Sequence, residues 1–311
     1  MINNRTISLL AIGFLFTLLM GCADDEGLVQ PDIPEEPSIY VDIPDENFER
    51  KLITLGIDTE DSLNRRILRS DALKITSLEV DSPFGTPDEE KITDLTGIEA
   101  FENLVYLSAG NNAIEEVDLV SNTKLEMVHL EVNFIQQLDV RHNTELVELS
   151  LLFNDLTEIT GINEAINLKS LNLSWNYLTE LSINNSSLEG LNVENNLLRT
   201  MHLTGCNSLI SIIAKQNELV TIDLSTNIAL KYLTISTNRL IELDLENNLN
   251  IEKLLLSGNE LSGLDVTNLE LLNLLDIRKN EALTCIKIAE GQSIATVNKQ
   301  DHQELNTHSC L

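Results

Sequence analysis

Leucine and isoleucine recur along most of the chain with a spacing that fits neither an amphipathic helix nor a simple alternating strand. The stretch LKSLNLSWNYLTEL (168–181) has leucine at its first, fourth, sixth and eleventh positions and asparagine at its ninth. Nine segments fit the template L-x-x-L-x-L-x-x-N-x-L, with starts separated by 20 to 22 residues. They start at Leu104, Leu125, Leu146, Leu168, Leu188, Leu209, Leu230, Ile251 and Leu272. A fixed phase over nine segments predicts a repeat array.

The template gives each position a physical role. In L-x-L the side chains alternate between the faces of a short strand, so positions 4 and 6 point inward and positions 3 and 5 outward. Successive turns are expected to stack their strands in parallel, about 4.8 Å apart. The ninth-position asparagines should be buried and should bond to backbone groups of their own and neighbouring turns. They are Asn112, Asn133, Asn154, Asn176, Asn196, Asn217, Asn238, Asn259 and Asn280.

A second ladder follows each strand, as in VDL (117–119) and LDV (138–140), and the return segments are too short for a long helix. Residues 94–104 and 158–168 share the frame x-T-G-I-x-x-x-x-N-L, which predicts a helical turn in each. The pattern therefore predicts a leucine-rich-repeat solenoid. We expect a right-handed superhelix of the α/β class, with a mostly extended convex side and a concave parallel sheet of about nine to ten strands.

The first repeat needs a cover for its hydrophobic face. Asp45 is expected to cap a helix whose apolar stripe is Phe48, Leu52 and Leu55. Residues 45–103 are thus predicted to form a helical N-terminal cap followed by a divergent first repeat.

The N-terminus carries an export signal. The apolar run from Ile7 to Met20 is too short to span a bilayer comfortably. LMGC (19–22) resembles the lipobox of bacterial lipoproteins, which implies cleavage before Cys22 and lipidation of its thiol; a cysteine after an ordinary cleavage site is the alternative. Residues 1–21 are predicted to be the signal peptide and residues 22–44 a flexible acidic, proline-containing tether.

The C-terminal end is expected to be closed by a disulfide. Residues 104–283 are assigned to the repeats and residues 284–311 to a C-terminal cap. An exported chain meets an oxidising compartment, so Cys285 and Cys310 are predicted to pair, with free thiols as the alternative. Cys206 stands at an asparagine position of the second ladder and is expected to fill a small buried slot.

Several stretches resemble a known family. ADDEG (23–27) looks like the surface-export signal of lipoproteins from the Bacteroidota. IPDENFERKLITLGID (43–58), ITDLTGIEAFENLVYL (92–107) and NEALTCI (280–286) resemble the surface leucine-rich-repeat lipoproteins of that group, and the repeats resemble those of internalins. The resemblance implies a non-enzymatic recognition protein, lipid-anchored in the outer membrane and exposed on the cell surface.

Composition and motifs narrow the function. With 50 Asp and Glu against 20 Lys and Arg, the net charge of −30 should repel nucleic acid and anionic lipid headgroups. H-E-x-x-H, G-x-S-x-G, phosphate-binding glycine loops and zinc-spaced Cys/His pairs do not occur. We therefore expect no enzyme activity, no cofactor, no metal site and no membrane contact beyond the lipid on Cys22.

Aspartates of the second ladder stack in register. Asp223, Asp244 and Asp265 occupy the same slot of consecutive turns, as do Asp118 and Asp139. Carboxylates about 5 Å apart repel by roughly 3 kcal/mol at an effective dielectric near 20. The repulsion is smaller where the carboxylates are exposed, and backbone hydrogen bonds or bound cations can offset it.

The outward positions predict a ligand site. Trp175, the only tryptophan, is not required by the leucine pattern and falls at position 8, as Phe153 does in the preceding repeat. Packing between neighbouring loops is the alternative role for Trp175. The predicted ligand-binding residues lie on or beside the concave face: Tyr106, Met127, His129, Phe153, Trp175 and Tyr232.

Aromatic anchors of this kind dominate interface energetics, so the expected ligand is a protein on a host or neighbouring-cell surface, as for an adhesin. A surface glycan-binding component is the first alternative, because exposed aromatic and asparagine side chains also suit sugar rings. A purely structural envelope lipoprotein is the second.

Overall fold

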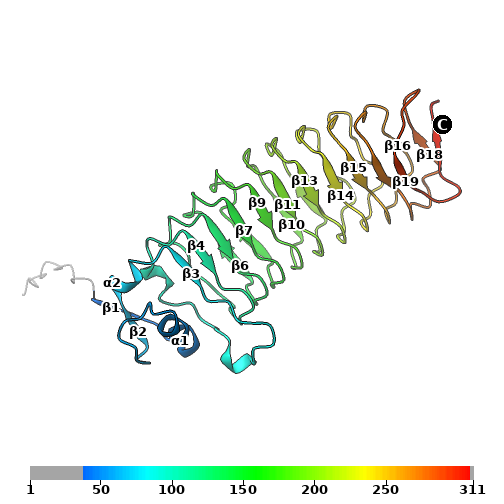
Figure 1. The fold of residues 1–311 in the computed structure, drawn as a ribbon. Coiled ribbons are helices and arrows are strands. Elements are labelled where there is room, and N and C mark those ends of the chain that lie inside the picture. Colours follow the sequence, from blue (N-terminus) through cyan, green and yellow to red (C-terminus); the bar gives the residue numbers. More distant parts are fainter. Residues whose placement is uncertain (1–37, 309–311) are drawn as a thin grey trace, which may run out of the picture. The chain divides into compact units, whose positions relative to one another are not determined.

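The computed structural model describes residues 38–308, which coil into a stack of short turns (Figure 1). The predicted signal peptide, most of the tether, Cys22 and Cys310 lie outside the described residues. Within residues 38–308, no helix has the length and apolar character needed to cross a membrane.

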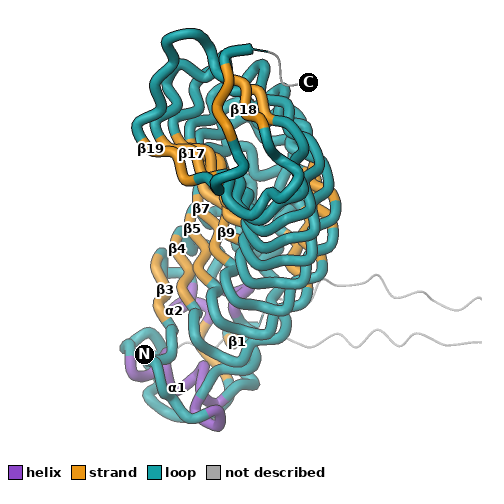
Figure 2. The backbone as a smooth tube through the Cα atoms, turned by 90° about the vertical axis from the view of Figure 1, so that its right-hand side faces the viewer, coloured by secondary structure: helices purple, strands orange, loops and turns teal. Residues whose placement is uncertain are grey.

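One parallel sheet of eleven strands runs the length of the stack, as Figure 2 shows on one side of the coil. Its strands are β3 (Ser77–Glu79), β4 (Tyr106–Ser108), β5 (Met127–His129), β7 (Glu148–Ser150), β9 (Ser170–Asn172), β11 (Gly190–Asn192), β13 (Ser211–Ile213), β14 (Tyr232–Thr234), β15 (Lys253–Leu255), β17 (Leu274–Asp276) and β19 (Thr296–Asn298). Each repeat pairs with the next in register, for example Leu149 with Leu171 and Leu171 with Leu191. The predicted solenoid is confirmed.

The sheet has one strand more than the nine to ten predicted. β3 supplies the strand of the divergent first repeat, and β19 comes from residues 284–308, which were assigned to a C-terminal cap. Val297 of β19 pairs with Leu275 of β17. Ile286, in the same C-terminal segment, is fully buried. The coil therefore continues past the last segment that fits the leucine template.

The second ladder forms three small parallel sheets, β6–β8, β10–β12 and β16–β18–β20. Their strands are β6 (Gln137–Asp139), β8 (Glu158–Thr160), β10 (Glu180–Ser182), β12 (Thr200–His202), β16 (Leu264–Asp265), β18 (Cys285–Lys287) and β20 (Glu304–Asn306). The frame at 94–104 forms the 3₁₀ helix η2 (Ile98–Ala100), whereas the frame at 158–168 forms only a turn. Cys285 is disulfide-bonded.

The core is an aliphatic ladder between the two sets of strands. Leu171 and Leu173 are 1% and 0% exposed, and their counterparts in the other repeats are buried in the same way. Completely burying one such side chain stabilises the fold by about 1.5–3 kcal/mol. The inward positions therefore hold the turns together and leave the outward positions free for other roles.

Two columns of buried polar side chains link successive turns. The ninth-position asparagines are at most 9% exposed. In Asn176, Oδ1 accepts from Leu156 N at 2.9 Å and Nδ2 donates to the carbonyls of Leu151 and Leu173 at 2.9 and 3.0 Å. In the second column Asn122, Asn143, Asn185, Cys206, Asn227 and Asn248 donate to backbone carbonyls. Burial raises the pKa of the Cys206 thiol, which keeps its proton for this bond.

The N-terminal cap is built on α1 (Glu46–Thr54) and also contains α2 (Arg69–Ala72) and η1 (Asp88–Glu90). Asp45 Oδ1 accepts from the first-turn amides, and its Oδ2 accepts from Thr93 N at 2.8 Å, which ties the helix to the first repeat. Phe48 and Leu52 are buried as predicted, but Leu55 is 49% exposed because the helix ends before it.

The predicted tether of residues 22–44 extends too far. Tyr40–Asp42 form strand β1, which pairs antiparallel with β2 (Arg66–Leu68). Val41 and Ile43 bury their side chains in the cap, so this segment gains apolar contacts that a free tether lacks.

Three carboxylates in the cap are buried and were not foreseen, those of Glu49, Asp58 and Asp71. Glu49 is fully buried, and its Oε1 accepts from Asn64 N and Arg65 N at 2.7 Å. Asp58 is 2% exposed, and its Oδ1 accepts from Glu60 N. The second oxygens of Glu49 and Asp58 are buried without a hydrogen-bond partner. Burial raises the pKa of Asp58, and the nearby acidic side chains add to the effect.

We expect Asp58→Asn to stabilise the fold by about 1 kcal/mol at pH 7, because it removes a buried, half-unpaired charge. Since the pKa of Asp58 is raised on folding, its protonated form favours the folded state below pH 3.8, and this contribution is lost as the pH rises through the folded-state pKa. The gain should therefore shrink toward pH 3.5. Urea unfolding of both proteins at pH 7 and pH 3.5 measures it, and an equal gain at both values would contradict the charge argument.

Candidate functional site

The first group of predicted site residues lies together on the main sheet. Tyr106 and Met127 are register partners on β4 and β5. The ring of Tyr106 meets that of His129 edge-on at 5.5 Å, and Tyr106 Oη lies 3.4 Å from His129 Nδ1. His129 Nε2 lies 3.3 Å from Glu148 Oε1 on the next strand. The result is a partly exposed polar–aromatic row across three strands.

Tyr232 does not belong to this row. It lies on β14, five strands from β5, which is roughly 24 Å at about 4.8 Å per strand. Its Oη donates to Glu252 Oε2 at 3.3 Å, and Lys253 Nζ lies 5.5 Å from its ring centre. The structure therefore divides the predicted patch.

Phe153 and Trp175 lie in the turns that follow β7 and β9, at one edge of the sheet rather than on its face. Both residues have positive φ, 59° and 58°. All nine position-8 residues share this left-handed conformation: Asn111, Val132, Phe153, Trp175, Asn195, Gln216, Thr237, Gly258 and Lys279. This turn directs position 8 away from the leucine core, which explains why the largest side chain stands at a non-leucine position.

Trp175 and Phe153 stack on each other. Their ring centres are 4.9 Å apart and their planes differ by 9°, as expected when equivalent side chains sit on adjacent turns. The pair remains 44% and 50% exposed. The ring of Trp175 thus packs against a neighbouring loop, as the alternative role predicts, and it also keeps the exposure that a ligand site requires.

The stacked pair lines a groove of about 500 Å³, which we call the edge groove. Its apolar side chains are all between 43% and 53% exposed: Val132, Phe134, Phe153, Trp175, Tyr177 and Leu197. Asp155 also lines it, whereas Tyr106, Met127 and His129 do not. Six large apolar side chains exposed side by side make the edge groove a candidate interaction site.

Of the six apolar residues of the edge groove, only Phe153 and Trp175 were assigned to the ligand site from the sequence, and position 10 was not considered. Phe134, Tyr177 and Leu197 stand at position 10, which the template leaves open. Their signal was a large apolar residue at that position in three of four consecutive repeats, beside the apolar residues of position 8.

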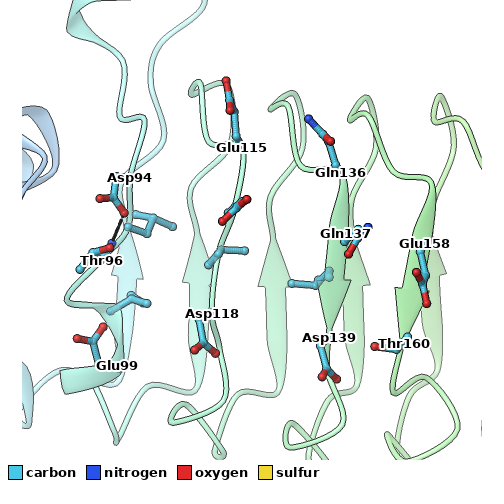
Figure 3. A pocket seen from close by; sticks show the side chains of 15 residues that line it. Asp94, Thr96, Glu99, Glu115, Asp118, Gln136, Gln137, Asp139, Glu158 and Thr160 are labelled. Carbon is cyan, nitrogen blue, oxygen red and sulfur yellow. Dashed lines mark hydrogen bonds between the residues drawn. The ribbon is translucent and has the colours of Figure 1, made fainter.

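A second hollow, of about 900 Å³, lies beside β6 and β8. Figure 3 shows the side chains that line it. Its lining includes seven acidic residues: Asp94, Glu99, Glu115, Glu116, Asp118, Asp139 and Glu158. No lysine, arginine or histidine lines it. Among the described residues, no group of three or more His, Cys, Asp or Glu side chains is arranged to hold a metal ion.

Backbone hydrogen bonds offset the stacking of the second-ladder aspartates. Each carboxylate accepts from the amide two residues further on, at 2.9–3.0 Å, in Asp118, Asp139, Asp223, Asp244 and Asp265. Hydrogen bonds from the Arg141 side chain lower the pKa of Asp139 to about 2. Hydrogen bonds within the chain therefore offset the repulsion between these carboxylates that the sequence predicts.

No protein-family model and no curated protein matches the sequence. Among solved structures, the functional domain of InlJ from Listeria monocytogenes has 24% identity and a TM-score of 0.70, covering 87% of this chain and 63% of that chain. The leucine-rich repeat domain of APL1B has 19% identity and a TM-score of 0.51, covering 68% and 58%. This chain thus spans less than two thirds of either. At these identities the likeness concerns the fold, which is the leucine-rich-repeat solenoid.

Proposed function

We propose that the chain is a lipid-anchored, cell-surface recognition protein. It binds another protein through the side of its solenoid that carries the main sheet and the edge groove. The observation that carries the proposal is the exposed Phe153–Trp175 stack within the edge groove. LMGC at 19–22 supports the lipid anchor, and the acidic segment at 23–27 supports surface display.

The backbone at the stack strengthens this assignment. A bulky side chain in the left-handed region costs about 1–2 kcal/mol relative to glycine, and asparagine enters that region more readily. Asn111 and Asn195 fill the same position in other repeats. Side chains as different as asparagine, threonine and lysine fill this position in other repeats, so the fold does not require aromatic rings at Phe153 and Trp175, and the exposed rings are available for recognition.

We expect Trp175→Asn to weaken partner binding at least tenfold and to shift the free energy of unfolding by no more than about 1 kcal/mol. Relief of the left-handed strain should offset the lost packing on Phe153. Solubilised surface proteins of host and neighbouring cells would be captured on the full chain, and the affinity of each captured protein then measured with both forms.

Tyr106→Ala serves as the matched change on the sheet face, because it removes an aromatic side chain outside the edge groove. A captured protein that binds Trp175→Asn and Tyr106→Ala as tightly as the wild type would refute recognition through this side of the solenoid.

A further inference from the structure

Most asparagines of the edge groove use their side-chain hydrogen bonds on the backbone. Within the described residues, the polar side chains left for a ligand are those of Trp175, Tyr177, Asn195 and Asp155. In Asn154, which lines the groove, Oδ1 accepts from Ile135 N at 3.0 Å and Nδ2 donates to the carbonyls of Leu130 and Leu151. Asn133, Asn176 and Asn196 are engaged in the same way. Backbone amides of the lining are also used, since Asn154 N bonds Trp175 O at 3.2 Å.

The small number of polar groups beside six exposed apolar side chains favours one class of ligand. A sugar ring carries several hydroxyl groups, and each hydroxyl that loses water without finding a partner costs about 1–3 kcal/mol. Apolar protein side chains require no such partners. The groove therefore favours a protein segment over a glycan.

One charge in the groove is uncompensated. The partly buried carboxylate of Asp155 has no hydrogen bond or ion pair with any residue of the described range 38–308. Lys91, the only basic residue of the lining, is paired with Asp88 at 3.0 Å. A free carboxylate beside exposed aromatic faces attracts a cation both through its charge and through the rings.

We propose that the edge groove binds a segment of the partner protein that presents a large apolar side chain next to a lysine or arginine. This inference rests on the protein recognition proposed above and names the chemistry of the partner. The apolar anchor packs on Phe134, Phe153 and Tyr177, and the cation pairs with Asp155. The net charge of −30 adds long-range attraction for a basic segment.

The probe is a random dodecapeptide library displayed on phage, selected on the full chain and counter-selected on Phe153→Asn. Enriched peptides are synthesised without tryptophan and titrated while the fluorescence of Trp175, the only tryptophan, is followed. We expect an aromatic or large aliphatic residue next to Lys or Arg, and a saturable blue shift. Replacing the basic residue by alanine, or Asp155 by asparagine, should weaken binding five- to tenfold.

Glu260→Gln is the matched control, because Glu260 is an exposed acidic residue at the same template position five repeats away. It should leave peptide affinity unchanged. The inference would be overturned if no peptide is enriched, or if the enriched peptides lack a basic residue. It would also be overturned if Asp155→Asn leaves peptide affinity unchanged, or if oligosaccharides bind in a way that depends on Phe153. A captured surface protein that needs Trp175 but is indifferent to Asp155→Asn would leave the proposed function standing and reject only this inference.

Discussion

Gly161→Ala is expected to destabilise the protein by about 3–5 kcal/mol. Gly161 has φ +88°, a conformation that alanine adopts only under strain. A Cβ atom would lie 2.2 Å from Arg141 N and 2.6 Å from Val140 C, both backbone atoms of the preceding turn. Neither can move without displacing the turn, so overpacking adds about 1–3 kcal/mol to the strain. Urea and thermal unfolding measure the loss.

Gly190→Ala is the matched control. Gly190 lies on β11 with nothing within 4 Å of an added Cβ, and its φ is not in the left-handed region. Alanine should leave stability unchanged or raise it by up to about 0.5 kcal/mol, since glycine weakens a strand. Similar losses for both substitutions would show that the backbone contact at Gly161 does not limit how the turns stack.

The repeats could be read from the sequence because a single physical requirement sets their period. Each turn must bury aliphatic side chains at positions 4 and 6 and satisfy backbone groups with asparagine at position 9, so the pattern recurs nine times. The frame shared by residues 94–104 and 158–168 was also visible, because Gly97 and Gly161 meet the same left-handed turn. Local rules that repeat leave a strong signal.

Features that depend on contacts between distant segments left a weaker signal. The pairing of β1 with β2 requires Val41 to meet Ile67, and the burial of Glu49 depends on the amides of residues 64–66. Neither contact leaves a periodic pattern in the sequence. The C-terminal turn was not predicted for a related reason. Its strand β19 follows a segment that does not fit the leucine template, so only its pairing with β17 identifies it.

The candidate site likewise has features that the sequence predicts and features that it does not. Its outward positions follow from the template, so exposure of Trp175 was predictable, whereas the direction of position 8 was not. The left-handed turn moves Phe153 and Trp175 off the sheet face and brings them beside position 10. That turn is a property of the backbone path, and asparagine or glycine occupies it in only three of nine repeats, so residue type did not reveal it.

Asn176→Ala is expected to destabilise the protein by about 3–5 kcal/mol, the second large effect. The substitution leaves the buried amide of Leu156 without a partner. It also removes one of the two asparagine hydrogen bonds at each of the carbonyls of Leu151 and Leu173, to which Asn154 and Asn196 still donate. A buried amide without a partner costs about 1–3 kcal/mol, and each of the two other hydrogen bonds contributes about 0.5–1.5 kcal/mol. The loss should appear as a lower midpoint of urea unfolding.

Alanine in the second column should cost less, about 2 kcal/mol. Asn248 donates to the carbonyls of Leu224 and Asn227 at 3.0 Å, but its Oδ1 is buried without a partner. Truncation there removes two bonds and also relieves one unsatisfied oxygen. Cys206 fills this column with a single hydrogen bond of 3.4 Å, which agrees with the smaller number of hydrogen bonds that the column requires. Asn247→Ala, at the exposed neighbouring residue, should change stability by less than about 0.5 kcal/mol. An equal loss at Asn176 and Asn248 would mean that burial alone, and not the number of satisfied groups, sets the stability of the stack.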